Sequence, residues 1–220
     1  TADSQQKLAG ARLYVLLDGG ESPETFESKA TEICRAGAHI VQLRDKKLGD
    51  RELLDRARLL RRITREYKTL FIVNDRPDLA VLSAADGVHV GQEELTIQDV
   101  RRIVGPEMLV GLSTHTIEQA RRAVLEGASY IGCGPTFPSG TKHFDSFPGL
   151  PFLREVATEI SLPAFAIGGI SLENIEQVLA TGMKRMALGG AVSFAAHPSR
   201  VIADLLANFP ENRPIGEVTS

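Results

Sequence analysis

Tryptophan is absent from the 220-residue sequence, and cysteine occurs only twice. Cys34 lies on the apolar face of a predicted helix and Cys133 in a predicted strand, far apart in the sequence and without the spacing of metal ligands. A free thiol in such a position behaves as a small hydrophobic side chain. Free thiols of this kind are typical of a reducing compartment, so we expect a cytoplasmic location.

Long apolar runs and a strong excess of one charge are also missing. No apolar stretch approaches the roughly 18–20 residues of a membrane-spanning helix, so we expect no membrane segment. The net charge of −3 lacks the basic excess of a nucleic-acid-binding protein. The basic run at 56–66 has aliphatic residues at helical spacing, which is typical of a solvent-exposed helix face. Residues 1–10 are polar and lack the apolar core of a signal peptide, so we predict a disordered lead-in there.

Strand-like runs rich in β-branched residues recur eight times along the chain, with amphipathic helical patterns between them. The strand-like runs lie at residues 12–18, 39–45, 70–75, 87–91, 109–115, 130–137, 163–169 and 185–192. The helical patterns lie at residues 24–36, 50–66, 96–104, 116–126, 149–159, 172–181 and 198–208. Continuous apolar strands alternating with helices predict a parallel sheet with helices outside, and eight strands close a (β/α)8 TIM barrel.

We therefore predict an α/β protein with a single TIM-barrel domain over residues 11–208, followed by a C-terminal tail over 209–220. The alternative is an open, doubly wound sheet. Such a sheet would be expected to carry a glycine-rich G-x-G-x-x-G turn after its first strand, and "LLDGGESPE" at 16–24 lacks that spacing.

Polar residues gather where the predicted strands end. In barrels of this kind the active site lies at the carboxyl ends of the strands. We therefore expect the site among the polar residues that follow the second to sixth strands, namely Gln42, Arg44, Asp45, Lys46, Asn74, Asp75, Gln92, Glu93, Glu94, Ser113, Thr114, His115 and Lys142.

Two glycine pairs, Gly168–Gly169 and Gly189–Gly190, end the seventh and eighth predicted strands. Loops at these positions commonly bind phosphate through backbone N–H groups and a helix N-terminus. Glycine allows the close approach and the positive φ that such a loop needs. The alternative is that the glycines simply turn the chain, and we favour a phosphate site.

Three cations are expected at the same end of the barrel. Arg44 and Lys46 lie two residues apart on one strand and therefore point the same way, and Lys142 follows the sixth strand. Three cations in one cleft repel each other, so an anion of multiple charge is their natural partner. The alternative is a set of salt bridges with Asp45, Asp75 and Glu94.

Asp75 and Glu94 come from adjacent strand ends and offer the hard oxygen ligands that suit Mg²⁺. Two phosphate sites that face each other suggest an enzyme that joins two phosphorylated substrates and releases pyrophosphate. The departure of pyrophosphate requires neutralisation of its negative charge more than it requires a general base. His89 lies within a predicted strand and is interpreted as structural, whereas His115 ends a strand and could be structural or catalytic.

Six segments together resemble thiamine phosphate synthase, over roughly residues 12–208 and in the expected order. They are "VQLRDK" (41–46), "VNDRPDLA" (73–80), "DGVHVGQEEL" (86–95), "GLSTHT" (111–116), "GPTFPSGTK" (134–142) and "AIGGI" (166–170). The resemblance implies a (β/α)8 barrel that joins hydroxymethylpyrimidine diphosphate to a thiazole phosphate, with Mg²⁺ required. In the family, ionisation of a C–O bond leaves a pyrimidine-methyl cation, which the thiazole nitrogen traps.

The resemblance also implies roles for individual residues. The pyrimidine diphosphate would be held by Gln42, Arg44, Lys46, Asn74, Ser113 and Lys142, of which Arg44, Lys46, Ser113 and Lys142 are the candidate catalytic residues. The metal would be held by Asp75 and Glu94. The thiazole phosphate would be bound by Ser139, Gly140, Thr141, Gly169, Gly189 and Gly190.

The sequence departs from the family pattern in three places. Glu94 stands where the second metal ligand is usually Asp, and its extra methylene shifts the carboxylate. Ser139 replaces the first threonine of the sixth loop and keeps a hydroxyl group. The pair Gly189–Gly190 replaces an aliphatic residue followed by Ser, so the backbone donors remain while the side chain is lost.

Two other functions compete with the synthase. A thiazole tautomerase of the same fold would use a base such as His115 and would not need Arg44, Lys46, Asn74, Asp75 and Lys142 together, so this set disfavours it. A non-catalytic sensor or carrier of the thiamine pathway has little reason to keep a metal site beside a diphosphate clamp. The sequence does not decide between a monomer and a homo-oligomer.

Overall fold

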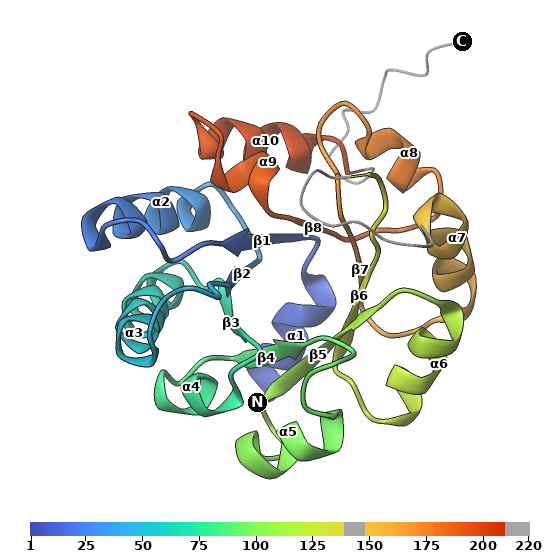
Figure 1. Ribbon diagram of the computed structural model, residues 1–220. Coiled ribbons are helices and arrows are strands. Elements are labelled where there is room, and N and C mark those ends of the chain that lie inside the picture. Colours follow the sequence, from blue (N-terminus) through green and yellow to red (C-terminus); the bar gives the residue numbers. More distant parts are fainter. Residues whose placement is uncertain (139–147, 210–220) are drawn as a thin grey trace.

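Eight parallel strands close into a barrel in the computed structural model, and helices surround it on the outside (Figure 1). The structure describes residues 1–138 and 148–209. Each strand pairs with the next, and β8 (Met186–Leu188) pairs with β1 (Leu13–Leu17), which closes the sheet. The predicted (β/α)8 TIM barrel is therefore confirmed, and the open-sheet alternative is wrong.

All eight predicted strands are present. The remaining six are β2 (Ile40–Leu43), β3 (Leu70–Asn74), β4 (Gly87–Val90), β5 (Leu109–Thr114), β6 (Tyr130–Cys133) and β7 (Ala164–Ile167). Most positions of these strands are buried on both faces, because one face lines the barrel interior and the other packs under the helices. This double burial explains why the strands are apolar runs without alternation.

The seven predicted helices also form, and the described part of the chain adds two short helices here and a third at its start. The predicted seven are α2 (Pro23–Arg35), α3 (Asp50–Glu66), α5 (Ile97–Val104), α6 (Ile117–Leu125), α7 (Gly149–Glu159), α8 (Ile175–Leu179) and α10 (Pro198–Ala207). The two short helices are α4 (Pro77–Leu82) and α9 (Gly190–Ser193). Ser22, Thr96 and Thr116 cap their helices by accepting a hydrogen bond from a backbone N–H three residues later.

The prediction of a disordered lead-in at residues 1–10 is wrong, because α1 (Ala2–Gly10) forms there. The Thr1 side chain caps this helix, and Leu8 is 1% exposed. Leu8 packs in the cluster that fills the barrel interior, beside Leu70 and Leu109 at the beginnings of their strands. The helix thus closes the amino end of the barrel. Burial of Leu8 stabilises the helix in this place, although most of its other residues are polar. The predicted tail begins at Phe209, which is buried, and its other residues, 210–220, lie outside the described part.

The barrel interior contains aromatic rings, and one of them fits only because the residue facing it on the neighbouring strand is a glycine. Tyr130 packs edge-on against Phe165 with ring centroids 5.8 Å apart. Gly111 of β5 lies beside these rings, and a β-carbon there would overlap Tyr130 and the imidazole of His89. A glycine inside a strand is normally unfavourable, and here it is required by the close approach of side chains.

We expect Gly111→Ala to lower the free energy of unfolding by about 2 kcal/mol or more, since overpacking of a filled core typically costs 1–3 kcal/mol. Urea titration followed by far-UV circular dichroism measures this change. Gly10→Ala is the matched control, because a β-carbon there meets nothing within 4 Å. Equal stabilities of the two variants would contradict the overlap at Gly111.

Candidate active site

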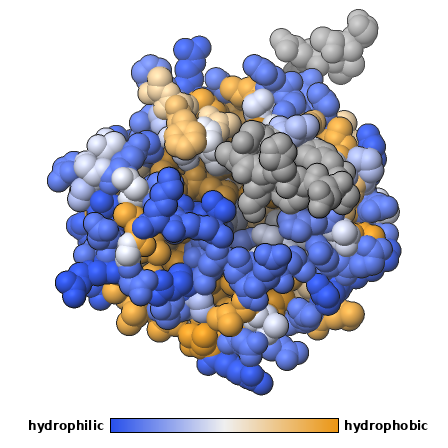
Figure 2. Space-filling model, in the orientation of Figure 1, coloured by the Kyte–Doolittle hydropathy of each residue, from blue (hydrophilic) through white to orange (hydrophobic). Residues whose placement is uncertain are grey.

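The carboxyl ends of the strands present the predicted site residues together at one end of the barrel. Gln42 lies in β2, Asn74 is the last residue of β3, and Ser113 lies in β5. Arg44 and Asp75 follow β2 and β3 directly. This end faces the viewer in Figures 1 and 2, with α1 behind the barrel, and Figure 2 shows hydrophilic residues over much of the face.

Lys46 and Asp75 form an ion pair across the β2 and β3 loops. Lys46 Nζ lies 3.4 Å from Asp75 Oδ2, with the two side chains 58% and 23% exposed. Among the described residues, the salt-bridge alternative therefore holds for the pair Lys46–Asp75. An ion pair this exposed contributes at most about 1 kcal/mol, so a multivalent anion or a metal ion can separate the partners.

Asp45 has a different role from the salt-bridge partner considered above. Its Oδ1 accepts hydrogen bonds from the backbone N–H groups of Lys47 at 2.7 Å and Leu48 at 2.9 Å. Burial acts to raise the pKa of Asp45, but these two backbone donors, together with hydrogen bonds from Asp18 and Gly19, outweigh it, and the pKa lies below its usual value. The carboxylate thus holds the β2 loop in a turn that carries Arg44 and Lys46.

The two predicted metal ligands differ in their surroundings. Asp75 is half-buried, has a φ of 58°, and donates its backbone N–H to the carbonyl oxygen of His89 at 2.8 Å. Glu94 is exposed, and its carboxylate folds back over Gly91, where a β-carbon would collide with it. Within residues 1–138 and 148–209, no three His, Cys, Asp or Glu side chains gather as a metal-binding group. A two-carboxylate site completed by phosphate and water oxygens does not require a third.

The first glycine pair, Gly168–Gly169, is required by close packing between two loops, which the sequence did not indicate. Gly168 and Gly169 have φ values of 99° and 66°, and they pack against the segment that follows β6. A β-carbon at Gly168 would lie 2.8 Å from Pro135 Cα. Phe137 N–H donates to the Gly168 carbonyl oxygen at 2.9 Å. The loops after β6 and β7 are therefore joined, and the glycines permit both this contact and an exposed backbone.

The second glycine pair begins a short extra helix after β8. Gly189 is the N-cap of α9 and Gly190 is its first residue. The Ser193 hydroxyl donates to the carbonyl oxygen of Leu16 at 2.6 Å, which ties α9 to β1. A short helix after the last strand is the usual position of a phosphate site in this fold. Ser139, Gly140, Thr141 and Lys142 lie outside the described residues.

His115 is held by the segment after β6. Its Nδ1 donates to the Gly134 carbonyl oxygen at 2.5 Å, and its backbone N–H donates to Gln119 Oε1 at 2.7 Å. The bond to a carbonyl oxygen requires a proton on Nδ1. These contacts anchor the β5 loop to the β6 loop and give His115 a structural role.

Sequence reasoning missed a hydrogen-bonded chain of buried side chains beneath the site. Gln42 Nε2 lies 2.6 Å from the Tyr14 hydroxyl, and that hydroxyl lies 3.0 Å from the hydroxyl of Tyr130. His89 then bridges Tyr130 at 3.2 Å and Ser113 Oγ at 2.9 Å. Tyrosines at inward-facing strand positions were the available signal, because a buried hydroxyl needs a partner.

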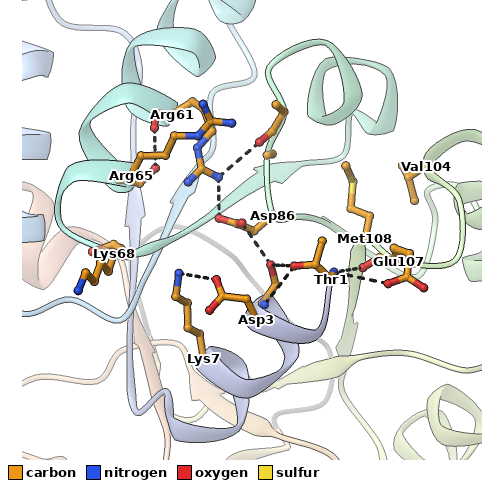
Figure 3. Close-up of a pocket in the computed structure, with 15 residues that line it drawn as sticks. Thr1, Asp3, Lys7, Arg61, Arg65, Lys68, Asp86, Val104, Glu107 and Met108 are labelled. Atoms are coloured by element: carbon orange, nitrogen blue, oxygen red, sulfur yellow. Dashed lines mark hydrogen bonds and ion pairs between the residues drawn. The ribbon is translucent and has the colours of Figure 1, made fainter.

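A pocket of about 480 Å³ lies at the opposite end of the barrel, near the residues that precede β3, β4 and β5 (Figure 3). Its charged groups are largely paired with one another. Arg61 lies 2.7 Å from Asp86, and Lys7 lies 2.8 Å from Asp3. The candidate active site is therefore at the carboxyl ends of the strands.

No helix in the described part of the chain is long and apolar enough to cross a membrane.

Cys34 and Cys133 are free and buried, as predicted.

Comparison with known proteins identifies relatives over most of the chain. The family model described as thiamine monophosphate synthase matches residues 13–192. A thiamine-phosphate synthase of Rhodopirellula baltica is 50% identical over 86% of this chain, which spans 52% of that protein. One of Halalkalibacterium halodurans is 38% identical over 93% of this chain and 98% of its own length. The structure of thiamine phosphate pyrophosphorylase from Pyrococcus furiosus superposes with a TM-score of 0.84 at 34% identity, covering 96% of this chain and 99% of that one.

His89 makes stability depend on pH. Burial, aided by the charge of Arg44, lowers the pKa of His89 to about 4. The unfolded imidazole binds a proton below about pH 6.5, whereas the folded one stays neutral until about pH 4. The stability that the neutral group provides is therefore complete above about pH 6.5 and is lost as the pH falls towards 4. The loss amounts to about 3 kcal/mol.

Urea titrations at about pH 7 and about pH 4.5 measure this loss, and His89→Gln should show a shallower decrease between the two. Carboxylates with lowered pKa values, such as Glu32 and Asp78, act in the same direction in both proteins. The difference between the proteins thus isolates His89, and parallel pH profiles would contradict its neutral state.

Proposed function

The chain belongs to the thiamine monophosphate synthase family, and we propose on this basis that it joins hydroxymethylpyrimidine diphosphate to a thiazole phosphate, forming thiamine phosphate and pyrophosphate. The observation that carries this proposal is the family match over residues 13–192. It includes the strand ends where Arg44, Lys46 and Asp75 stand together at one end of the barrel. The chain spans about half the length of some curated relatives that it matches.

In this proposal the cations bind the diphosphate. Arg44 is half-buried and lies near enough to His89 to lower its pKa. Lys46 is exposed at the mouth, and its ion pair with Asp75 keeps its ammonium group on the same side. Lys142 comes from the β6 loop. When the C–O bond breaks, its electron pair leaves with the pyrophosphate, and these cations stabilise the charge that develops there.

Mg²⁺ would be held by Asp75 and Glu94. Asp75 fits this role because it is a half-buried carboxylate whose ion-pair partner among the described residues, Lys46, is exposed. Glu94 offers a second carboxylate from the next loop, on a side chain that is exposed to solvent. The bound ion would neutralise charge on the diphosphate. No proton transfer is needed, since the ring nitrogen of the thiazole forms the new C–N bond with its lone pair.

The two ends of the pyrimidine substrate require different surroundings. Neutral polar side chains from inside the barrel, those of Gln42, Asn74 and Ser113, suit an uncharged heteroaromatic ring. Gln42 is buried and Asn74 and Ser113 are half-buried, so the ring would lie deeper than the exposed Lys46. The charged diphosphate then lies outward among the cations.

The thiazole phosphate would lie across the mouth, against the loops after β6, β7 and β8. Gly169, Gly189 and Gly190 would offer backbone N–H groups there, and Ser139, Gly140 and Thr141 would contribute from the β6 loop. The contact between Phe137 and Gly168 supports this grouping, because it brings the β6 and β7 loops together.

We expect Arg44→Ala and Lys142→Ala each to reduce kcat/KM for thiamine phosphate formation on the order of 100-fold or more, since each removes positive charge from the departing diphosphate. Lys47→Ala is the matched control, because it removes the charge of an exposed side chain next to Lys46 and keeps the backbone N–H that Asp45 binds. Chromatography of thiamine phosphate measures the rate. Absence of product from the unaltered protein with any divalent metal would exclude the synthase. Binding of both substrates without turnover would indicate the carrier instead.

The metal site makes a separate prediction. Asp75→Asn should raise the Mg²⁺ concentration needed for half-maximal activity at least about tenfold, since a carboxylate ligand loses its charge. Asp78→Asn removes a nearby carboxylate that is paired with Arg76 at 2.6 Å, and it should leave this concentration unchanged. Loss of activity in His115→Ala with a silent Asp75→Asn would favour the tautomerase.

A further inference from the structure

The hydrogen-bonded chain beneath the site connects two of the proposed substrate contacts through the barrel interior. It runs from Gln42 in β2 through Tyr14 in β1, Tyr130 in β6 and His89 in β4 to Ser113 in β5. The exposed fractions of Gln42, Tyr14, Tyr130 and His89 are 3%, 2%, 0% and 9%. The chain therefore couples Gln42 and Ser113 with little access to water.

The members of the chain are uncharged. Burial raises the pKa of both tyrosines, and burial together with Arg44 lowers the pKa of His89 to about 4. Each hydroxyl group thus carries one proton, and the imidazole carries one proton on one nitrogen. Each hydroxyl has one proton and two partners in this chain, so when it accepts from one partner its proton has the other partner as its acceptor.

The amide of Gln42 sets the direction. Its Nε2 donates to the Tyr14 hydroxyl. We therefore assign the Tyr14 proton to the bond with Tyr130 and the Tyr130 proton to the bond with Nδ1 of His89, since this direction gives every hydroxyl proton in the chain an acceptor. The proton of His89 is then on Nε2, which donates to the oxygen of Ser113. The Ser113 hydroxyl proton is left to donate elsewhere, and Oε1 of Gln42 remains an acceptor.

Packing keeps the members of the chain in place. The Tyr14 and Tyr130 rings both pack edge-on against Phe165, at centroid distances of 5.3 Å and 5.8 Å. Gly111 leaves the space that Tyr130 and His89 occupy, and a β-carbon at Gly132 would lie 3.5 Å from His89 Cε1. The rings cannot rotate away without opening a cavity, so the direction of the chain is built into the fold.

We propose that Tyr14, Tyr130 and His89 are positioning residues that make Gln42 present an acceptor and Ser113 present a donor to the pyrimidine ring. This inference rests on the proposed function, which supplies the ring. An aminopyrimidine matches the pattern, since its amino group donates and its ring nitrogens accept. A pyrimidinone, with a carbonyl in place of the amino group and a proton on the adjacent nitrogen, presents the reverse pattern. The chain thereby selects the amino form across the width of the barrel.

The decisive variant is Tyr130→Phe, which removes one hydroxyl group and interrupts the chain at its centre. The ratio of kcat/KM for the aminopyrimidine diphosphate to that for its pyrimidinone analogue measures the selection. We expect this ratio to fall about tenfold or more, because Gln42 and Ser113 are then free to reverse their polarity. A loss of folded enzyme would lower both rates by the same factor and leave this ratio unchanged. The KM for the thiazole phosphate should stay within about twofold of its original value, because the proposed thiazole site contains none of the side chains of the hydrogen-bonded chain.

Tyr67→Phe is the matched control, since it removes the hydroxyl of the third tyrosine, which accepts from Arg35 on the outer surface at 3.2 Å. Its ratio should equal that of the unaltered protein. Tyr14→Phe breaks the chain one link away and should lower the ratio as Tyr130→Phe does, so either variant suffices if the other does not fold. An unchanged ratio in a folded Tyr130→Phe or Tyr14→Phe protein would overturn the inference.

Calorimetric binding of the two pyrimidine diphosphates separates this inference from the proposed function. If the full chain produces no thiamine phosphate but binds the amino form more tightly, and Tyr130→Phe loses that preference, the positioning role stands while the synthase is rejected. If the unaltered protein produces thiamine phosphate but does not distinguish the two rings, the synthase stands and the positioning role is rejected. Binding of neither compound would reject both.

Discussion

Closure of the sheet by pairing of β8 with β1 is the constraint on which the rest of the structure depends. Leu13, Tyr14 and Val15 take Met186, Ala187 and Leu188 as partners, and no edge strand remains among the described elements. Because all eight strands are parallel, closure brings their carboxyl ends to one mouth. Residues as distant in sequence as Gln42 and Gly189 are therefore placed around the same opening.

Closure also creates an interior that must be filled, and this protein fills it partly with polar groups. Unpaired buried polar groups are costly, whereas a fully satisfied set gives the core one defined arrangement. Tyr14, Tyr130 and His89 meet that condition through one another and through the buried Gln42 and the half-buried Ser113. The same side chains thus contribute to core packing and support the candidate site from below.

Around the mouth, the structure is held by contacts between and within the loops that follow the strands. Asp45 shapes the β2 loop, His115 holds the β5 loop to Gly134, and Phe137 joins the β6 loop to Gly168. Each contact uses a polar side chain or a glycine that the sequence alone would assign equally well to ligand binding. Several residues near the site therefore act on its shape, while Arg44 and Lys46 carry the charge.

The sequence by itself determined the eight strands, the order of the helices around them and the end of the barrel at which Arg44, Asn74, Asp75 and Ser113 lie, because hydrophobic periodicity and strand ends are local properties. It did not reveal that residues 2–10 form a helix under the barrel, since a single buried leucine in a polar segment is a weak signal. Only the tertiary structure decided which partners Asp45 and Lys46 take, and that Tyr14, Tyr130 and His89 connect. These contacts join residues up to 116 positions apart, and their geometry depends on barrel closure and side-chain packing, which no local pattern contains.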